Sequence, residues 1–107
     1  MSEAAEVWLE FADRDLQAAQ VLSQNSDLWE AACFHFHQAA EKALKAVLLA
    51  GGKRAPRIHN LVVLAREAAA VAPDLNAQAQ PAARLNPFYL QTRYPVDVEH
   101  RVERHQV

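Results

Sequence analysis

The sequence predicts an all-α fold. Apolar residues make up 51% of the 107-residue chain, which contains only two glycines and is rich in alanine and leucine. This composition favours helix over strand. Apolar residues also recur at helical spacing through three long stretches. A chain of this length forms one domain, residues 1–107, and its high surface-to-volume ratio favours a partner subunit.

Two long helices are expected first. The first spans about residues 2–23, and its apolar stripe consists of Trp8, Phe11, Ala12, Leu16, Ala19 and Leu22. The second spans about residues 28–50, with Asp27 and Glu30 at the spacing of a reciprocal cap. Gly51-Gly52 supplies the left-handed turn that ends it.

Shorter helices follow. Apolar spacing predicts a third helix over residues 61–71, with His59 or Asn60 at its start. A fourth, short helix is expected within residues 75–85, where Pro81 limits its length. The count is therefore four to five helices.

Charge, cysteine usage and hydropathy exclude several classes of protein. A net charge of −2 argues against a surface that binds nucleic acid everywhere, so any RNA contact must be local. The lone Cys33 forms no intrachain disulfide and suits a reduced compartment. No apolar run approaches the roughly 20 residues that span a bilayer, and Glu3 and Glu6 do not suit a signal peptide. We expect a soluble, cytoplasmic protein with no membrane partner.

The strongest candidate for catalysis is a pair of residues near the C-terminal end of the sequence. Arg93 precedes Pro95, which suits the first turn of a short last helix, and His100 follows. A guanidinium holds a phosphate with two hydrogen bonds, and an imidazole transfers protons near neutral pH. Together they suit chemistry on a phosphodiester. The alternative is that Arg93 pairs at a helix junction and His100 lies on a solvated face.

Two groups of charged residues each allow two interpretations. Gln38, Glu41, Lys42 and Lys45 form neighbouring pairs on the second helix, which predicts a solvated, salt-bridged face or support for an active groove. The cations of the following loop serve either solubility or phosphate docking, for RNA or for a nucleotide. They are Lys53, Arg54 and Arg57.

The remaining histidines and aromatic residues are assigned structural roles. His35 and His37 lie two positions apart, which does not suit a metal pair on a helix, and we predict neither a metal nor a cofactor. His35 is expected to be a hydrogen-bonded packing residue. The aromatic residues are expected in the core or a dimer interface: Trp8, Trp29, Phe36, Phe88, Tyr89 and Tyr94. Tyr94 could also stack on a base.

Three separated motifs stand out in the chain: Cys33-Phe34-His35-Phe36-His37-Gln38-Ala39-Ala40-Glu41-Lys42-Ala43-Leu44-Lys45, then His59-Asn60-Leu61, then Tyr89-Leu90-Gln91-Thr92-Arg93-Tyr94-Pro95. In this order and spacing they resemble the HEPN domain family, in its small prokaryotic single-domain branch. The resemblance covers roughly residues 7–95. It implies an up-and-down helical bundle that commonly dimerises.

The resemblance also implies an activity. Many family members are metal-independent endoribonucleases, often toxins paired with a minimal nucleotidyltransferase antitoxin. Their signature is an arginine followed after four to six residues by a histidine, which Arg93 and His100 match. Gln38, Glu41 and Lys42 would then support the groove. The rival hypothesis is a non-catalytic helical dimer that binds a nucleotidyltransferase or a nucleotide.

Overall fold

The computed structural model describes residues 2–89, and that part of the chain is helical with no strand. This confirms the predicted all-α fold. The last helix expected from Pro95 lies outside the described residues. In chain order the elements are α1 (Glu3–Leu22), the 3-10 helix η1 (Ser26–Leu28), α2 (Trp29–Ala50), α3 (Leu61–Ala68), the 3-10 helix η2 (Pro73–Gln78) and α4 (Ala79–Ala83).

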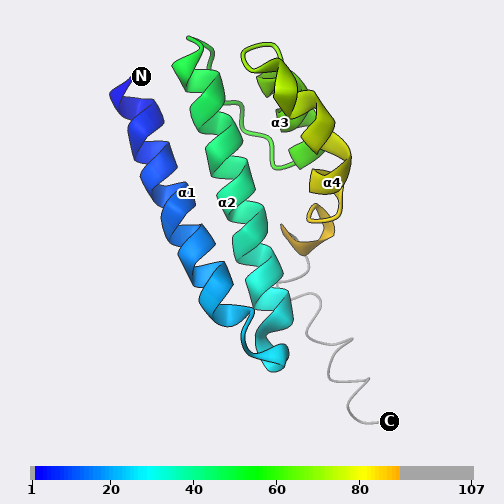
Figure 1. Ribbon diagram of the computed structural model, residues 1–107. Coiled ribbons are helices and arrows are strands. Elements are labelled where there is room, and N and C mark those ends of the chain that lie inside the picture. Colours follow the sequence, from blue (N-terminus) through cyan, green and yellow to red (C-terminus); the bar gives the residue numbers. More distant parts are fainter. Residues whose placement is uncertain (1, 90–107) are drawn as a thin grey trace.

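The two long helices form an antiparallel pair, and α3 and α4 lie on the opposite side of α2 from α1 (Figure 1). Helix α1 begins where Ser2 accepts a hydrogen bond at Oγ from the Ala5 backbone N–H, 3.2 Å away. Glu3 and Glu6 place negative charge in its first turn, where the helix dipole favours it. The predicted bounds of the first helix are confirmed to within one residue at each end.

The start of α2 differs from the prediction. Asn25 accepts a hydrogen bond from the Asp27 N–H at 2.9 Å and starts η1, while α2 follows Leu28 with no side-chain cap. The predicted reciprocal cap of Asp27 and Glu30 is therefore wrong. The physical reason is that Asp27 already lies inside a helical turn, so it cannot adopt the extended conformation of a capping residue.

The end of α2 is as predicted. Gly52 has a φ of +78°, in the left-handed region that favours glycine. The N–H of Gly52 bonds to the carbonyl of Leu49, and the N–H of Lys53 bonds to that of Leu48. These two bonds form a Schellman motif, which satisfies the last carbonyls of the helix.

Alanines at seven-residue intervals pack α1 against α2. Ala5, Ala12 and Ala19 are the buried residues of α1, and α2 buries Ala32, Ala39 and Ala46. The predicted stripe on the first helix is therefore only partly right, because Phe11 is 46% exposed and Leu16 is exposed as well. Small side chains let the two backbones approach closely, and the larger side chains are left on the flanks of the pair.

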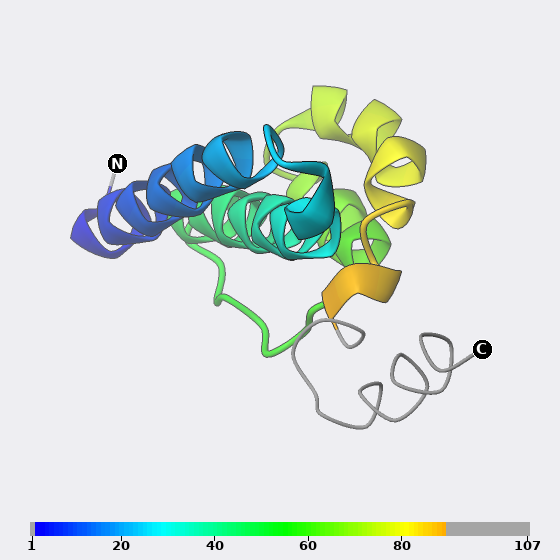
Figure 2. The same cartoon turned by 90° about the horizontal axis from the view of Figure 1, so that it is seen from below.

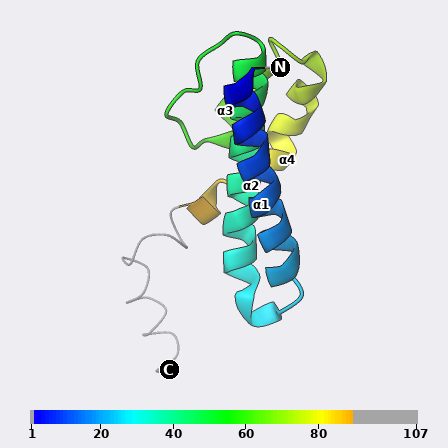
Figure 3. The ribbon, with the colours of Figure 1, turned by 90° about the vertical axis from the view of Figure 1, so that its left-hand side faces the viewer.

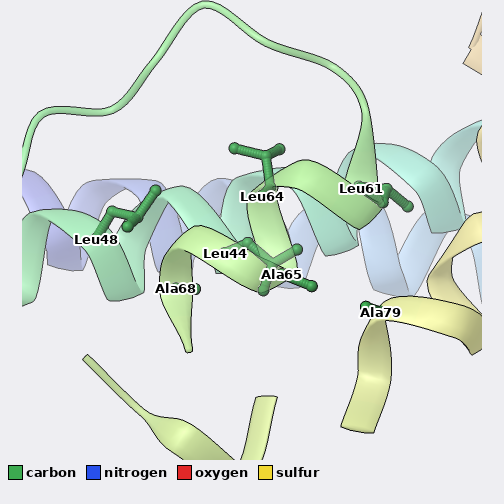
Figure 4. Packing of buried hydrophobic residues seen from close by; sticks show 7 residues of the cluster. All are labelled: Leu44, Leu48, Leu61, Leu64, Ala65, Ala68 and Ala79. Carbon is green, nitrogen blue, oxygen red and sulfur yellow. The ribbon is translucent and has the colours of Figure 1, made fainter. Parts of the chain in front are cut away.

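A second packing layer joins α2 to the short helices. It consists of Leu44, Leu48, Leu61, Leu64, Ala65, Ala68 and Ala79, drawn as sticks in Figure 4. Four of these seven residues come from α3, and they form the buried side of that helix. Helix α2 is thus covered on two sides, by α1 through alanines and by α3 through leucines.

Helix α3 ends earlier than predicted. It stops at Ala68, and residues 69–71 form a turn in which the Val71 N–H bonds to the Ala68 carbonyl. Ala72 is extended, as expected before Pro73 because the proline ring disfavours helical backbone in the preceding residue.

The predicted short helix within residues 75–85 is also revised. A 3-10 segment, η2, precedes α4, so the region holds two short elements. Pro81 is the third residue of α4, in the first turn, where its missing N–H breaks no helical hydrogen bond.

Residues 51–60 form a loop that crosses one side of the bundle, and residues 87–89 lie on that same side (Figures 2 and 3). Helix α4 lies on the opposite side in both views. Asn86 links these parts, because its Oδ1 accepts from the Leu61 N–H at 2.8 Å and its Nδ2 donates to Asn60 at 3.0 Å. These bonds hold the end of the loop to the segment that follows α4.

Candidate functional site

Five residues form a polar cluster where the loop meets α2. His37, Glu41 and Lys45 come from α2, His59 comes from the loop, and Tyr89 comes from the segment after α4. The spacing of four residues puts the three α2 side chains on one side of that helix. This arrangement is called the polar cluster below.

The α2 residues of the polar cluster are buried. Glu41 is 4% exposed, Lys45 is 5% exposed and His37 is fully buried. Glu41 accepts a hydrogen bond from Lys45 Nζ at 3.2 Å through Oε2, and one from His59 Nδ1 at 2.9 Å through Oε1. A buried carboxylate with two such donors is held in one orientation. Within the described residues, no buried side-chain nitrogen or oxygen lacks a hydrogen-bond partner.

His37 is held in its neutral form. Its Nε2 donates to the backbone carbonyl of His59 at 2.9 Å, so the ring carries its proton there, and Gln38 approaches Nδ1 at 3.4 Å. Burial lowers the pKa of His37 because desolvation penalises the imidazolium, and the nearby Glu41 carboxylate opposes that effect only in part. A neutral His37 therefore attaches the loop backbone to α2.

His59 is the accessible member of the polar cluster. Its side chain is 46% exposed, although Nδ1 is bound to Glu41. Its ring stacks on Tyr89 with centroids 4.2 Å apart and an interplanar angle of 15°. None of the hydrogen bonds found in residues 2–89 uses Nε2 of His59. An imidazole with one nitrogen on a carboxylate and the other without a hydrogen bond to the described residues can transfer protons.

A second group of charges lies between the long helices. Asp15 of α1 accepts from His35 Nδ1 at 2.9 Å and from Lys42 Nζ. His35 is thus hydrogen-bonded, as predicted, but it is only half-buried, and the wholly buried histidine is His37. Lys42 is engaged in an ion pair with α1.

The prediction of a solvated face at residues 38–45 is wrong. Gln38, Glu41 and Lys45 are all buried, although the predicted ion pair of Glu41 with Lys45 is present. The reason is tertiary, because His59 and its loop dock on this face from another part of the chain. The other interpretation, that these residues support a groove, stays a prediction.

The predicted loop cations are exposed. Lys53, Arg54 and Arg57 all lie in the loop that carries His59, and they are open to a ligand. The other predicted site residues, Arg93, Tyr94 and His100, lie outside the described residues. No group of three or more potential metal ligands occurs within residues 2–89.

The aromatic residues of the described chain are not core residues. Trp8, Phe36, Phe88 and Tyr89 are half-buried, and Trp29 is 55% exposed. Their expected place in the core is therefore wrong, whereas a place at an interface stays a prediction. For Trp8, Trp29 and Phe36 the reason is the close contact of the alanine-lined helices, which leaves no room for large rings between them.

Sequence reasoning missed the roles of His37 and His59 and the burial of Lys45. A signal for His37 was present, because it falls two turns before Leu44 and three turns before Leu48 on the apolar side of α2. His59 was identified only as a possible start of the third helix. Its contact with Glu41 spans 18 positions, which no local pattern reveals.

The fold and the polar cluster define a small helical-bundle domain with a buried ionic network under a basic loop. The chain belongs to the HEPN domain family, whose family model matches residues 5–107. Membership indicates a helical domain of the kind that acts on RNA or binds nucleotides. Comparison with curated proteins and with solved structures gave no match. No helix in residues 2–89 is long and apolar enough to cross a membrane.

Proposed function

We propose that the protein is a metal-independent endoribonuclease of the HEPN type that cleaves single-stranded RNA. The ribose 2′-OH attacks the adjacent phosphorus and leaves a 2′,3′-cyclic phosphate and a 5′-OH end. Arg93 stabilises the negative charge that grows on the phosphoryl oxygens, and His100 transfers a proton. Family membership and the match of these two residues to the family signature support the assignment.

The observation that carries the proposal is the stacking of Tyr89 on His59. Arg93 follows Tyr89 by only four residues in the chain, so the sequence that carries the proposed catalytic pair begins directly after a residue of the polar cluster. The basic loop belongs to the same region, because it ends in His59. Lys53, Arg54 and Arg57 then contact phosphates of the RNA, and Tyr94 offers a ring on which a base stacks. Gln38, Glu41 and Lys42 hold the groove in shape.

The proposal includes partners. HEPN domains commonly dimerise, and we propose a homodimer that acts as the toxin of a toxin–antitoxin pair with a nucleotidyltransferase. A two-fold axis brings equivalent residues of two protomers to one shared groove. Such a groove suits an RNA strand that is long enough to contact both protomers.

The test is incubation of purified protein with single-stranded RNA in EDTA, beside Arg93→Ala and His100→Ala variants that fold and assemble equally well. We expect cyclic phosphate ends from the wild type and a loss of roughly a hundredfold or more in either variant. DNA of the same sequence, which has no 2′-OH, should stay intact. Equal cleavage by wild type and variants would contradict the proposal.

A second candidate function is a non-catalytic binding module, favoured by the exposed apolar flank of α1. Val7, Phe11 and Val21 are all exposed, Val21 to 68%, and a shallow groove lined by Arg14, Ala18 and Val21 adjoins them. In that case Phe11→Glu and Val21→Glu should abolish capture of a nucleotidyltransferase, while Arg93→Ala should not. For nucleotide binding through the loop cations, ATP at millimolar concentration should raise the melting temperature.

A further inference from the structure

The reaction proposed above needs two proton transfers. One proton leaves the attacking 2′-OH, and another must reach the departing 5′-oxygen. An arginine side chain cannot accept a proton at physiological pH. One His100 serves only one of the two transfers at a time, so full acid–base catalysis uses a second ionisable group, which either another residue of the same protomer or His100 of the second protomer in the shared groove supplies.

Two histidines of the described residues are hydrogen-bonded to carboxylates. His59 is bound to Glu41 and His35 is bound to Asp15, each through Nδ1 at 2.9 Å. In both pairs the carboxylate also accepts a hydrogen bond from a lysine. The pairs differ in exposure, because the side chain of His59 is 46% exposed and that of His35 is 33% exposed.

The two pairs also differ in what holds the ring. Three contacts fix His59: Glu41 binds Nδ1, His37 binds its backbone carbonyl, and Tyr89 stacks on its face. These contacts fix the ring in position before any substrate arrives. A preorganised group loses little entropy in the transition state, which is a property of catalytic residues.

The hydrogen bond to Glu41 determines which nitrogen of His59 is available. A carboxylate can only accept, so Nδ1 carries the proton and Nε2 has a free lone pair in the neutral ring. Within residues 2–89, the ionisable groups around His59 are Glu41, which binds Nδ1, Tyr89, which stacks on the ring, and His37, which binds the backbone carbonyl of His59. Lys45 acts on this group through the shared Glu41 carboxylate. Glu41 is the direct contact, and its negative charge stabilises the imidazolium that forms when Nε2 takes a proton.

We propose that His59 is the general base of the RNA cleavage, an inference that rests on the proposed function. Its Nε2 takes the proton of the 2′-OH as the O2′–P bond forms. The P–O5′ bond breaks, and His100 gives its proton to the 5′-oxygen. The products are a 2′,3′-cyclic phosphate and a 5′-OH, and proton exchange with water restores both histidines. Glu41 is a positioning residue in this scheme, because it acts through His59.

The position of His59 in the chain also suits a general base that acts on RNA. Arg57 precedes it by two residues in the loop, and Lys53 and Arg54 belong to the same loop, so phosphate-binding charge and the free Nε2 are carried by one segment. Tyr89 connects His59 with the segment that carries Arg93. His35 has no such neighbours along the chain.

The test uses His59→Asn. The asparagine Nδ2 can take the place of the histidine Nδ1 and keep the hydrogen bond to Glu41, but asparagine does not titrate. We expect kcat to fall about 10²- to 10⁴-fold, the range for loss of one general acid or base, with KM nearly unchanged. The matched control is His35→Asn, which removes the other carboxylate-paired histidine and should stay within threefold of wild type.

A substrate with an activated leaving group separates the two proton transfers. In a uridine 3′-(4-nitrophenyl phosphate), the aryloxide leaves without being protonated. His100→Ala should therefore recover most of its activity on this substrate, whereas His59→Asn should stay slow because the 2′-OH still needs a base. The pH–rate profile of His59→Asn should lose its acidic limb, and that of His100→Ala its alkaline limb.

Each outcome is decisive. A wild-type protein that does not cleave RNA overturns the proposed function and this inference with it. Cleavage that is lost in His100→Ala but kept in His59→Asn overturns this inference alone, and so does equal loss in His59→Asn and His35→Asn. If the asparagine variant does not fold, nitrogen NMR of the wild type decides instead: a neutral His59 with its proton on Nε2 has its lone pair on Nδ1, beside Glu41, so Nε2 cannot act as the base and the proposal fails.

Discussion

Ionisable side chains buried on α2 are the most unusual residues of this small domain. Charged groups are rarely buried unless they are paired, and here Glu41 holds both Lys45 and His59. Such a network contributes less to net stability than its geometry suggests, because desolvation offsets the Coulomb attraction. Removing one member is costly, since the others are then left buried and unpaired.

Glu41→Gln should therefore destabilise the protein strongly. The change keeps the shape of the side chain but removes the charge that compensates Lys45, and the free energy of unfolding should fall by about 3 kcal/mol. Urea unfolding followed by circular dichroism measures it. Glu67→Gln, at an exposed position of α3, is the matched control and should change the value by less than about 0.5 kcal/mol. Equal effects at both positions would show that the Glu41 network is not buried in solution.

His37 should make stability depend on pH. Burial lowers its pKa in the folded protein, so the unfolded chain binds more protons once the pH falls below about 6.5. The stability contributed by neutral His37 is thus complete above that pH and is lost as the pH falls toward the folded-state pKa. The slope from this one group cannot exceed about 1.4 kcal/mol per pH unit.

The measurement compares wild type with His37→Gln at pH 7.5, 6.5 and 5.5. Glutamine keeps an N–H donor for the carbonyl of His59 and does not titrate. The difference in unfolding free energy between the two proteins should be largest at pH 7.5 and shrink at pH 5.5. A difference that is constant over this range would mean that His37 titrates alike in the folded and unfolded chains.

At the scale of the elements, the alanine spacing of the long helices determines how closely they pack. Asp15 accepts a hydrogen bond from His35, and the Lys45 ammonium lies 5.6 Å from the centroid of the Trp8 ring. These two contacts define the antiparallel register of α1 and α2. This register places Ala12 opposite Ala39, in the middle of the contact. Both are buried, and a larger side chain there would force the helices apart.

Ala12→Leu should lower the free energy of unfolding by about 1–3 kcal/mol, the usual cost of overpacking. Ala4→Leu, at an exposed position of the same helix, should have little effect, because alanine and leucine have similar helix propensities. Chemical unfolding of both variants beside wild type measures the contrast. If Ala12→Leu were as stable as Ala4→Leu, the two helices would be more loosely packed than described.

At the scale of the whole molecule, the charge distribution matters more than the net charge of −2. Three exposed cations lie within residues 53–57 of the loop that also carries His59, so positive charge is concentrated locally on an acidic protein. Binding of RNA through these cations releases counterions, which makes affinity fall as salt rises.

Replacing Lys53, Arg54 and Arg57 together by Gln should weaken RNA binding and its dependence on salt. For single strands, loss of three phosphate contacts should reduce the slope of log K against log salt concentration by about 2. Binding is measured in the His100→Ala background, so that the RNA stays whole. Arg66→Gln with Arg84→Gln, exposed cations elsewhere, should leave the slope unchanged. Equal slopes in the triple variant and its parent would exclude the loop as the phosphate-binding surface.

The helices could be predicted from the sequence, because the signals that begin and end them are local. Ser2 caps α1, Gly52 ends α2 in the left-handed conformation, and Asn60 caps α3 by accepting from the N–H groups of Val62 and Val63. Each signal acts within a few residues. The exceptions are also local in cause, such as the turn that ends α3 at Ala68 before the proline at position 73.

The sequence by itself determined the all-α class, the two long helices and the family that the chain belongs to. Only the tertiary structure decided which polar residues of α2 are buried and which histidine faces solvent beside a carboxylate. Glu41 and His59 are 18 positions apart, and their contact depends on how the loop and α3 dock on α2. Helical periodicity shows which residues share a face of a helix, but what covers that face is set by packing between segments that are distant in the sequence.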